Sequence, residues 1–526
     1  MPTIKVKKLR LVLVSSLIMV MLFKVSSYHR NEGYAQKPVL ERIHAEADII
    51  KRGLSTISWK QGLHYDEVDD SMIRYEGMST CNRSTVLVIP GLLKGTNFVQ
   101  HQSLDRGGPL GELLQWSDLI AGLYVLGHDV TLEHDTRIVS MRLLEYINRH
   151  SSDCDNEYDI IYLDRPAMAT FPMEVQKAYR CCFRLLDVYG TQAMYRDPIY
   201  KETHLLQGAR DAELLELKQY YTFYPQTPDN TFLGFVVTEK KDRNKTKKQD
   251  IAVLYGKNMR YLRGKEHYIS LLTKYLDVHY TMPQPLSISA EARLYNDGIL
   301  SSSDYATLLD RAKIVVGLGH PIEGTGAMEA LAHGCVFFNP KYIGTDQNIF
   351  KNIGKPTHRL ITSQIPYLEQ YVGPPNVYTI NTNNDTEVIT NLRKALHQTD
   401  FAPFIPYEFT MVGYLDRLAM LIEHQNFCRR DRNTTWPPMT LLISIEADIG
   451  QSCSTGCDDK GSLDINCQLV LWDADIVHPS VKGNRTYQAC TLQENNRLFS
   501  CEGTSSDSRR ICPCRRYKKY QVALPD

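Results

Sequence analysis

Short apolar runs that alternate with helical patterns constrain the fold of this chain more than any other feature of its sequence. The first series has apolar runs at 85–90, 159–163 and 183–188, and residues 112–126 have helical spacing up to Gly127. Glycine is common just after a helix because it adopts the left-handed conformation without strain. Strands that are separated by helices predict parallel βαβ units.

A second series of the same kind follows the turn-rich segment 224–230. Between the two series, residues 240–248 carry six basic side chains, which we interpret as a solvated linker. The expected strands of the second series are 250–255, 278–281, 312–317, 335–338 and 377–380, and the expected closing helix is 387–397. Two successive α/β units predict a two-lobed enzyme that binds its ligands in a cleft.

A glycine-rich turn within residues 315–338 joins an expected buried strand to a helix. Gly324 and Gly326 would let the backbone approach a diphosphate, which the N–H groups of the helix would face. Glu323 and Glu329 lie six residues apart, and a carboxylate there can accept hydrogen bonds from both hydroxyls of a ribose. Because the glycine spacing matches neither a Walker A loop nor GxGxxG, an ordinary tight strand–helix junction is the alternative.

Two further charged residues suit group-transfer chemistry. Lys355 follows a glycine in a loop, where it would neutralise the charge of a leaving diphosphate without a metal, or else be a surface lysine. Glu112 lies where a glycine-rich segment enters the helix at 112–126. Its carboxylate is either a general base or a complement to the helix dipole. No aspartate pair follows a convincing strand, so we expect no metal.

The N-terminal residues predict a membrane anchor at 11–28. Four basic residues precede an apolar run at 11–23, which residues 25–28 extend if Lys24 places its charge in the interface. A helix of that length spans about 27 Å, against a hydrocarbon core of roughly 30 Å. The basic flank would leave residues 1–10 in the cytosol, with a stem at 29–80 beyond the membrane. A cleavable signal peptide is the alternative.

Glycosylation sequons and clustered cysteines both fit an exported protein. The sequons begin at Asn82, Asn244, Asn384, Asn433 and Asn484. Eight of the 13 cysteines lie at or after Cys428, and an oxidising compartment favours disulfides over zinc ligation. The 60 basic and 60 acidic side chains give no global basic field, so nucleic acid is not an expected partner.

Six strings in the sequence are long and specific. They are GGPLGELLQWSD at 107–118, YTFYPQTPDNTFLGF at 221–235, NIGKPT at 352–357, PYEFT at 406–410, GQSC at 450–453 and ICPC at 511–514. They resemble the N-acetylglucosaminyltransferase V family, the α-1,6-mannosylglycoprotein 6-β-N-acetylglucosaminyltransferases, and the likeness runs from about Thr85 to Leu524. The resemblance implies a GT-B fold, an α/β architecture with two Rossmann-like lobes. The expected lobes are 81–235 on the acceptor side and 236–425 for the nucleotide sugar, followed by a disulfide-rich module at 426–526.

The resemblance also implies a Golgi type II membrane enzyme with a lumenal catalytic region. Such an enzyme transfers N-acetylglucosamine from UDP-N-acetylglucosamine to O6 of the α-1,6-linked mannose of N-glycans on secretory glycoproteins. The transfer inverts the configuration at the anomeric carbon and needs no metal or other cofactor. Glu112 aligns with the catalytic base of the family, and Glu329 and Lys355 align with its donor-site residues. Asp187 and Tyr189 align with acceptor-side residues, with tyrosine at a position where phenylalanine is usual.

The resemblance further implies a set of disulfides. The pairs are Cys81–Cys154, Cys181–Cys428, Cys453–Cys512, Cys457–Cys514 and Cys467–Cys490. Cys182, Cys335 and Cys501 remain, and Cys335 is expected to be a buried thiol because it lies in an apolar strand. The terminal cysteines are expected to cap a lobe rather than form a separate ligand-binding module.

One departure from the family leaves the acceptor open. The family has a tryptophan on the acceptor side, where this sequence has Arg210. A sugar-stacking contact is therefore lost or supplied by another residue. The alternatives are a transferase of the same fold that acts on another acceptor, such as O-mannosyl glycans, or a catalytically inactive secreted glycan-binding homologue.

Overall fold

The computed structural model of this 526-residue chain divides into two compact units. The described residues of the first unit fall within Met1–Leu104, Glu112–Val236 and Met411–Asp526, and those of the second fall within Asp105–Gly111 and Val237–Thr410. The residues that the structure describes are 84–91, 110–133, 135–149, 157–190, 215–225, 230–237, 247–256, 259–282, 293–343, 361–425, 427–428, 442–460, 465–467, 479–482, 491–492 and 508–516.

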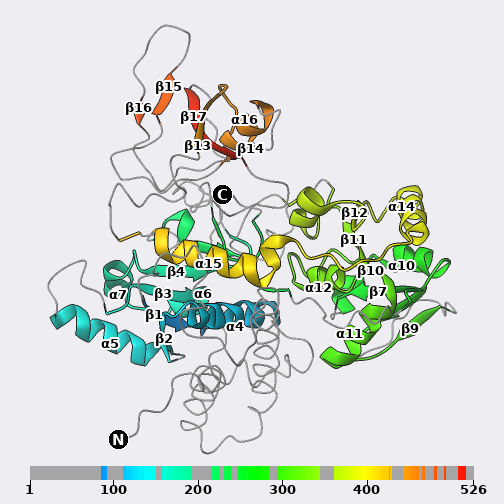
Figure 1. Cartoon of the computed structure of the whole chain (residues 1–526), viewed down its shortest axis with the longest axis horizontal. Coiled ribbons are helices and arrows are strands. Elements are labelled where there is room, and N and C mark those ends of the chain that lie inside the picture. The colour runs from blue at the N-terminus through cyan, green and yellow to red at the C-terminus, as the bar shows by residue number, and fades with distance from the viewer. Residues whose placement is uncertain are drawn as a thin grey trace, which may run out of the picture. The chain divides into compact units, whose positions relative to one another are not determined.

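The first unit is built on a six-stranded sheet whose neighbouring strands are all parallel (Figure 1). In spatial order its strands are β2 (Asp129–Leu132), β1 (Thr85–Ile89), β3 (Ile160–Asp164), β4 (Phe183–Leu186), β5 (Tyr220–Thr222) and β6 (Thr231–Phe232). Strands β1, β3 and β4 are buried along nearly their whole length, as parallel strands covered on both faces are. From β1 the chain first adds β2 on one side and then β3 on the other side, so the order in which strands are added reverses between β1 and β3.

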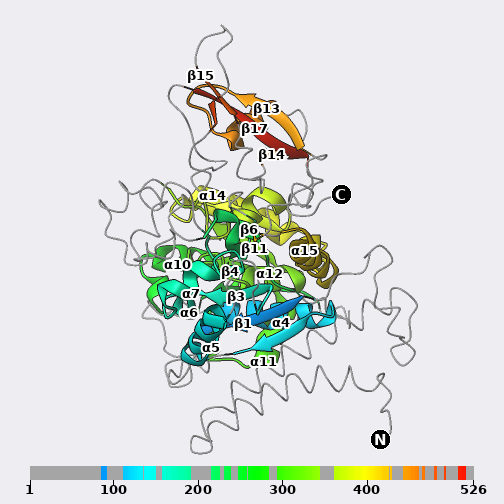
Figure 2. The same cartoon turned by 90° about the vertical axis from the view of Figure 1, so that its left-hand side faces the viewer.

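Helices cover both faces of this first sheet (Figure 2). On one face, α4 (Leu110–Val125) and α15 (Met411–His424) pack against each other, and on the other lie α5 (Thr136–Arg149) and α7 (Met173–Ala178). A Cβ on Gly122 of α4 would lie 2.7 Å from Leu418 of α15, so the glycine allows close approach of the two helices. The sequence placed α15 in the second lobe, which was expected to extend to residue 425, but its apolar side packs on the first sheet.

The second unit contains another six-stranded parallel sheet. In spatial order its strands are β12 (Val377–Ile380), β11 (Val336–Pro340), β10 (Ala312–Gly317), β7 (Gln249–Tyr255), β8 (Asp277–Tyr280) and β9 (Leu294–Asn296). If these strands are numbered 1 to 6 in chain order, starting with β7, the sheet read from β9 to β12 has the order 3-2-1-4-5-6. This is the strand order of a Rossmann sheet. Helices α10 (Glu266–Thr273) and α14 (Asp385–His397) share a buried apolar cluster with the sheet. The expectation of two parallel, Rossmann-like units is confirmed.

The C-terminal residues of the first unit form a small antiparallel sheet, in which β17 (Ser508–Arg516) pairs with three other strands. The other strands are β13 (Leu442–Ala447), β14 (Ile465–Cys467), β15 (Pro479–Lys482) and β16 (Thr491–Leu492). Two disulfides, Cys453–Cys512 and Cys457–Cys514, join α16 (Cys453–Lys460) to β17. Leu217 belongs to the same buried cluster as these cysteines, so the module packs on the first unit as expected.

Within the described ranges, no helix is both long enough and apolar enough to cross a bilayer. The predicted anchor at 11–28 lies outside those ranges and stays a prediction.

Candidate active site

The loop after β10 is the candidate ligand site of the second unit. In open parallel sheets, ligands bind at the carboxyl ends of the strands, at the point where the strand order reverses. In this sheet that point lies between β7 and β10. Residues 318–325 leave the carboxyl end of β10 there and lead into the short helix α12 (Gly326–Ala332).

Gln364, a fully buried residue that the sequence analysis did not single out, holds this loop in place. Its side-chain oxygen accepts a hydrogen bond from the N–H of Gly319 at 2.9 Å, and its side-chain nitrogen donates to the carbonyl of Pro321 at 2.9 Å. Its backbone carbonyl accepts from the N–H of Glu323 at 3.0 Å. The hydroxyl of Tyr342 donates to the carbonyl of Gly319. The loop therefore has a defined shape before any ligand binds.

Gly324 and Gly326 make room for the ring of Tyr255, at the end of β7. A Cβ on Gly324 would overlap the Tyr255 hydroxyl, and one on Gly326 would lie 2.6 Å from a ring carbon. The N–H of Gly326 donates to that hydroxyl at 3.3 Å. Burial, with a smaller contribution from Glu329, raises the pKa of Tyr255, so its hydroxyl stays neutral. The packing of Tyr255 accounts for both glycines, and their contact with a donor stays a prediction.

The two predicted glutamates differ in accessibility. Glu323 is fully buried, and its φ of 51° lies in the left-handed region that residues other than glycine adopt uncommonly. Glu329 lies on α12 with an exposed side chain. Of this pair, Glu329 is therefore the one that a ribose in solution can reach.

Basic side chains lie close to the same loop. The ring of His320 stacks on Tyr261, with 5.3 Å between ring centroids. Burial first, and then the positive charges of Lys265 and Arg260, lower the pKa of His320. This positive potential at the carboxyl ends of β7 and β10 suits an anionic ligand. These residues were not predicted from the sequence, although Arg260 and His320 lie within five residues of the ends of two expected strands. Lys355 lies outside the described residues.

In the first unit, Glu112 lies in the first turn of α4 and is half-buried. The helix is fixed by Trp116, which is buried in the core, and by the carboxylate of Asp118, which accepts a hydrogen bond from the N–H of Val236 at 2.7 Å. A carboxylate on a rigid helix, still reached by solvent, has the access that a general base needs.

Asp187 and Tyr189 directly follow β4, and the structure adds Arg165 to them. Nε and Nη2 of Arg165 lie 2.8 and 2.7 Å from the same oxygen of Asp187. The other oxygen of Asp187 accepts a hydrogen bond from the N–H of Tyr189 at 3.2 Å. Arg165 begins α6 (Arg165–Met168) at the end of β3, so neighbouring parallel strands bring the three residues together. Arg210 lies outside the described residues.

Several predicted covalent features fall within the described residues. The structure contains the disulfide Cys181–Cys428 as well as the two that join α16 to β17. Cys335 is a buried thiol, as expected, and burial raises its pKa to about 11. Asn384 is exposed, and its side chain caps α14 by accepting from the N–H of Glu387.

The remaining predictions about covalent features lie outside the described residues. They concern Cys81, Cys154, Cys490, Cys501, Asn82, Asn244, Asn433 and Asn484. In the part of the chain that the structure describes, the one group of potential metal ligands that lies close together is Cys181, Cys182 and Cys428, two of which form a disulfide. Metal independence therefore stays a prediction.

Two parallel sheets, each with polar or charged residues at the carboxyl ends of its strands, define a two-unit α/β protein of the kind that binds nucleotides and sugars. Comparison with known proteins narrows this class. The model of glycosyltransferase family 18 matches residues 56–514, and the chain belongs to this family.

Named relatives cover most of the chain. Human alpha-1,6-mannosylglycoprotein 6-beta-N-acetylglucosaminyltransferase A is 35% identical over 488 residues, which cover 86% of this chain and 65% of that protein. The Caenorhabditis elegans alpha-1,6-mannosylglycoprotein 6-beta-N-acetylglucosaminyltransferase is 33% identical over 507 residues, covering 89% and 74%. The chain thus spans slightly less than two thirds of the human relative. A solved glycotransferase of kitacinnamycin is 13% identical with a TM-score of 0.36, covering 66% of this chain and all of the other.

Proposed function

We propose that this chain transfers N-acetylglucosamine from UDP-N-acetylglucosamine to O6 of the α-1,6-linked mannose of N-glycans, which starts a β-1,6 branch. The observation that carries this proposal is membership of glycosyltransferase family 18, together with relatives named for this reaction that match 86% and 89% of the chain. The acceptors are N-glycans on secretory glycoproteins.

The second unit binds the donor in this proposal. The exposed carboxylate of Glu329 accepts hydrogen bonds from the ribose hydroxyls, near the glycine turn with Glu323, Gly324 and Gly326. Lys355 and the positive charges that act on His320 stabilise the diphosphate as it departs. Because the loop at 318–325 is already ordered by Gln364, little conformational entropy is lost when the donor binds.

The first unit binds the acceptor. Glu112 removes the proton from the mannose O6 as that oxygen attacks C1 of the donor sugar from the face opposite UDP. A single displacement inverts the anomeric centre, so no side chain needs to form a covalent intermediate. Asp187 and Tyr189 contact the mannose, and Arg165 orients the carboxylate of Asp187.

We also propose which ligand each unit binds and where in the cell the protein lies. The two parallel sheets support a GT-B fold. In this proposal the donor binds to the second unit and the acceptor to the first. The N-terminal segment at 11–28 anchors the chain in the Golgi membrane as a type II protein, with the sheets in the lumen. Sequons and disulfides support passage through an oxidising compartment.

A transfer assay with and without a chelator tests this function. Purified lumenal protein is incubated with UDP-N-acetylglucosamine and a biantennary N-glycan, and the glycan product is quantified. We expect equal product in both conditions, because lysine and histidine side chains of the chain replace a metal at the diphosphate. No product from folded protein that binds UDP would contradict the transfer, and an absolute metal requirement would contradict the proposed leaving-group chemistry.

A further inference from the structure

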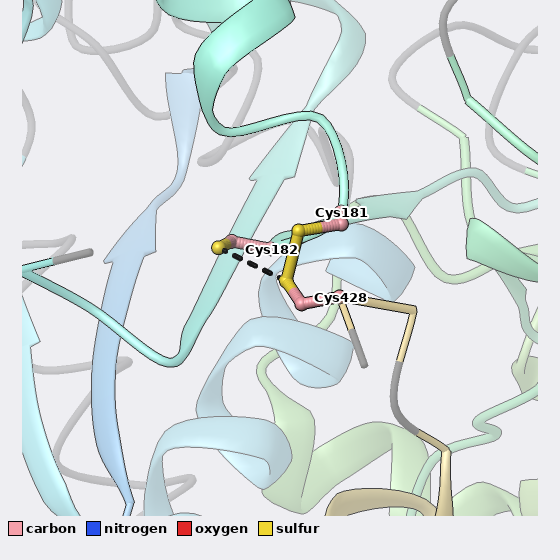
Figure 3. A group of neighbouring side chains, drawn as sticks. All are labelled: Cys181, Cys182 and Cys428. Atoms are coloured by element: carbon pink, nitrogen blue, oxygen red, sulfur yellow. Dashed lines mark hydrogen bonds between the residues drawn. A yellow bond between two sulfur atoms is a disulfide. The ribbon is translucent and has the colours of Figure 1, made fainter. Parts of the chain in front are cut away.

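Three sulfur atoms lie together near the start of β4, and none of them takes part in the proposed transfer. Cys181 and Cys428 form a disulfide, and the sulfur of Cys182 lies 3.6 Å from that of Cys428 (Figure 3). All three sulfurs lie within 4.8 Å of one another. Cys182 is a thiol that is 1% exposed and lies in the core cluster of the first unit, whereas Cys181 is half-buried.

We propose that these residues form a thiol–disulfide exchange site in which Cys428 bonds to either of the two neighbouring cysteines. The thiolate of Cys182 attacks the sulfur of Cys428, and a bond between Cys182 and Cys428 forms. The bond between Cys181 and Cys428 breaks, and Cys181 leaves with the electron pair and takes up a proton. The step contains one thiol and one disulfide before and after, so it needs no oxidant or reductant.

The side chain of Arg184 holds the segment with Cys181 and Cys182 next to the segment with Cys428, independently of the disulfide. Arg184 is buried, and Nη1 of its guanidinium donates to the carbonyl of Cys181 at 2.8 Å. Nη2 donates to the carbonyl of Gln425 at 2.9 Å, and the guanidinium lies over the ring of Phe427, 4.3 Å from its centroid. One side chain thus ties the segment before β4 to the segment after α15, and this tie remains while the sulfur–sulfur bond moves.

Exchange changes which thiol a reagent can reach. It replaces the buried thiol of Cys182 with the half-buried thiol of Cys181. A small-molecule disulfide such as oxidised glutathione can then be attacked by the Cys181 thiolate, which forms a mixed disulfide and releases reduced glutathione. The structure therefore assigns Cys181 as a site of reversible modification that is accessible only in the exchanged form. The inference does not depend on the proposed sugar transfer.

Tryptic peptides make the two forms distinguishable by mass spectrometry. Cleavage after Arg180 and Arg184 isolates the two neighbouring cysteines in residues 181–184, and cleavage after Arg417 and Arg429 isolates Cys428 in residues 418–429. The folded full-length protein is incubated with N-ethylmaleimide at several pH values, quenched in acid and digested without reduction. Fragmentation of the peptide 181–184 then locates the label.

We expect the label on Cys181, at a rate that rises about tenfold per pH unit while the thiolate is the minor form. Oxidised glutathione should modify the same residue. Cys335 is a matched control, because it is also a buried thiol and has no disulfide beside it; we expect it to stay unlabelled in the folded protein. Label on Cys182 rather than Cys181 would show direct access without exchange and would overturn the proposal.

Two variants test the alternative bond directly. Cys181→Ser should still fold and should contain a bond between Cys182 and Cys428, detected as linked peptides 181–184 and 418–429. Cys182→Ser should contain the original disulfide and should show no labelling of Cys181 at any pH. A Cys181→Ser protein that is folded, judged by its circular dichroism, but has a reduced Cys428 would contradict the proposal.

Discussion

The two units hold their candidate ligand sites with different interactions. In the second unit, the loop at 318–325 is fixed by neutral hydrogen bonds to the fully buried Gln364. In the first unit, Asp187 is fixed mainly by Arg165, whose side chain is 24% exposed. A buried polar group left without its partner costs about 1–3 kcal/mol, whereas solvent compensates part of the loss of a partly exposed ion pair. The loop of the second unit therefore depends more strongly on its one buried partner, Gln364, than Asp187 of the first unit depends on Arg165.

The largest expected effect comes from Glu112, which the proposal makes the reacting group of the acceptor side. Glu112→Gln keeps the shape of the side chain but cannot accept a proton, so kcat should fall by roughly 10²- to 10⁴-fold. Steady-state kinetics and UDP affinity are measured on the same protein, and UDP affinity should not change. Retained turnover would remove Glu112 as the base.

Loss of the Gln364 hydrogen bonds in the second unit should mainly weaken binding of the donor. Gln364→Ala leaves the N–H of Gly319 and the carbonyl of Pro321 without their side-chain partner, so the loop loses its shape. We expect the KM for UDP-N-acetylglucosamine to rise roughly ten- to a hundredfold, or about 1.4–2.8 kcal/mol. Gln249→Ala, at the exposed opposite end of the same sheet, is the control. An equal rise in the KM for the acceptor would indicate general destabilisation instead.

Loss of the ion pair between Arg165 and Asp187 in the first unit should mainly weaken binding of the acceptor. Arg165→Ala frees the carboxylate of Asp187 to rotate, so the KM for the glycan acceptor should rise about five- to tenfold with an unchanged KM for the donor. Arg165→Lys should restore part of the loss, and Arg149→Ala, which removes an exposed ion pair with Glu145, should have no effect. A change confined to the KM for the donor would contradict the division of roles.

The smallest expected effect is a pH dependence of donor binding. The pKa of His320 is lowered in the protein, and a nearby diphosphate would raise it again by stabilising the imidazolium. Binding then takes up a proton, so affinity for UDP-N-acetylglucosamine should increase as the pH falls from about 8 to about 5.5. Only the interval between the free and the bound pKa of His320 contributes, so we expect a total increase in affinity of no more than about threefold. His320→Asn should give a flat profile, and the same slope in the variant would exclude His320 as the titrating group.

The sequence predicted the strands that carry the two sites because they are buried on both faces. Residues 160–164 and 312–317 are nearly continuous apolar runs, and both are interior strands of parallel sheets. The edge strand β2 has half-buried side chains and no such run, and the sequence analysis missed it. The helix α15 was assigned to the other lobe because its partner, α4, lies almost three hundred residues earlier in the chain.

The candidate site was predicted where a residue belongs to a motif or to a family string, as Glu112, Glu329 and Asp187 do. Gln364 and Arg165 were not, because each is a single polar residue outside any motif. Their partners lie 45 and 22 residues away, so their roles depend on tertiary structure. The same holds for Tyr255, whose ring packs against Gly324 and Gly326 although it lies 71 residues before Gly326 in the chain.

The structure of the reaction product tests the central claim most directly. Unmodified protein is incubated with UDP-N-acetylglucosamine and a mixture of a biantennary N-glycan and an O-mannosyl glycan, and the product is analysed by NMR. The account predicts one new N-acetylglucosamine, β-linked to O6 of the α-1,6-linked mannose of the N-glycan. An α-linked sugar, another position, or transfer to the O-mannosyl glycan in preference to the N-glycan would contradict it.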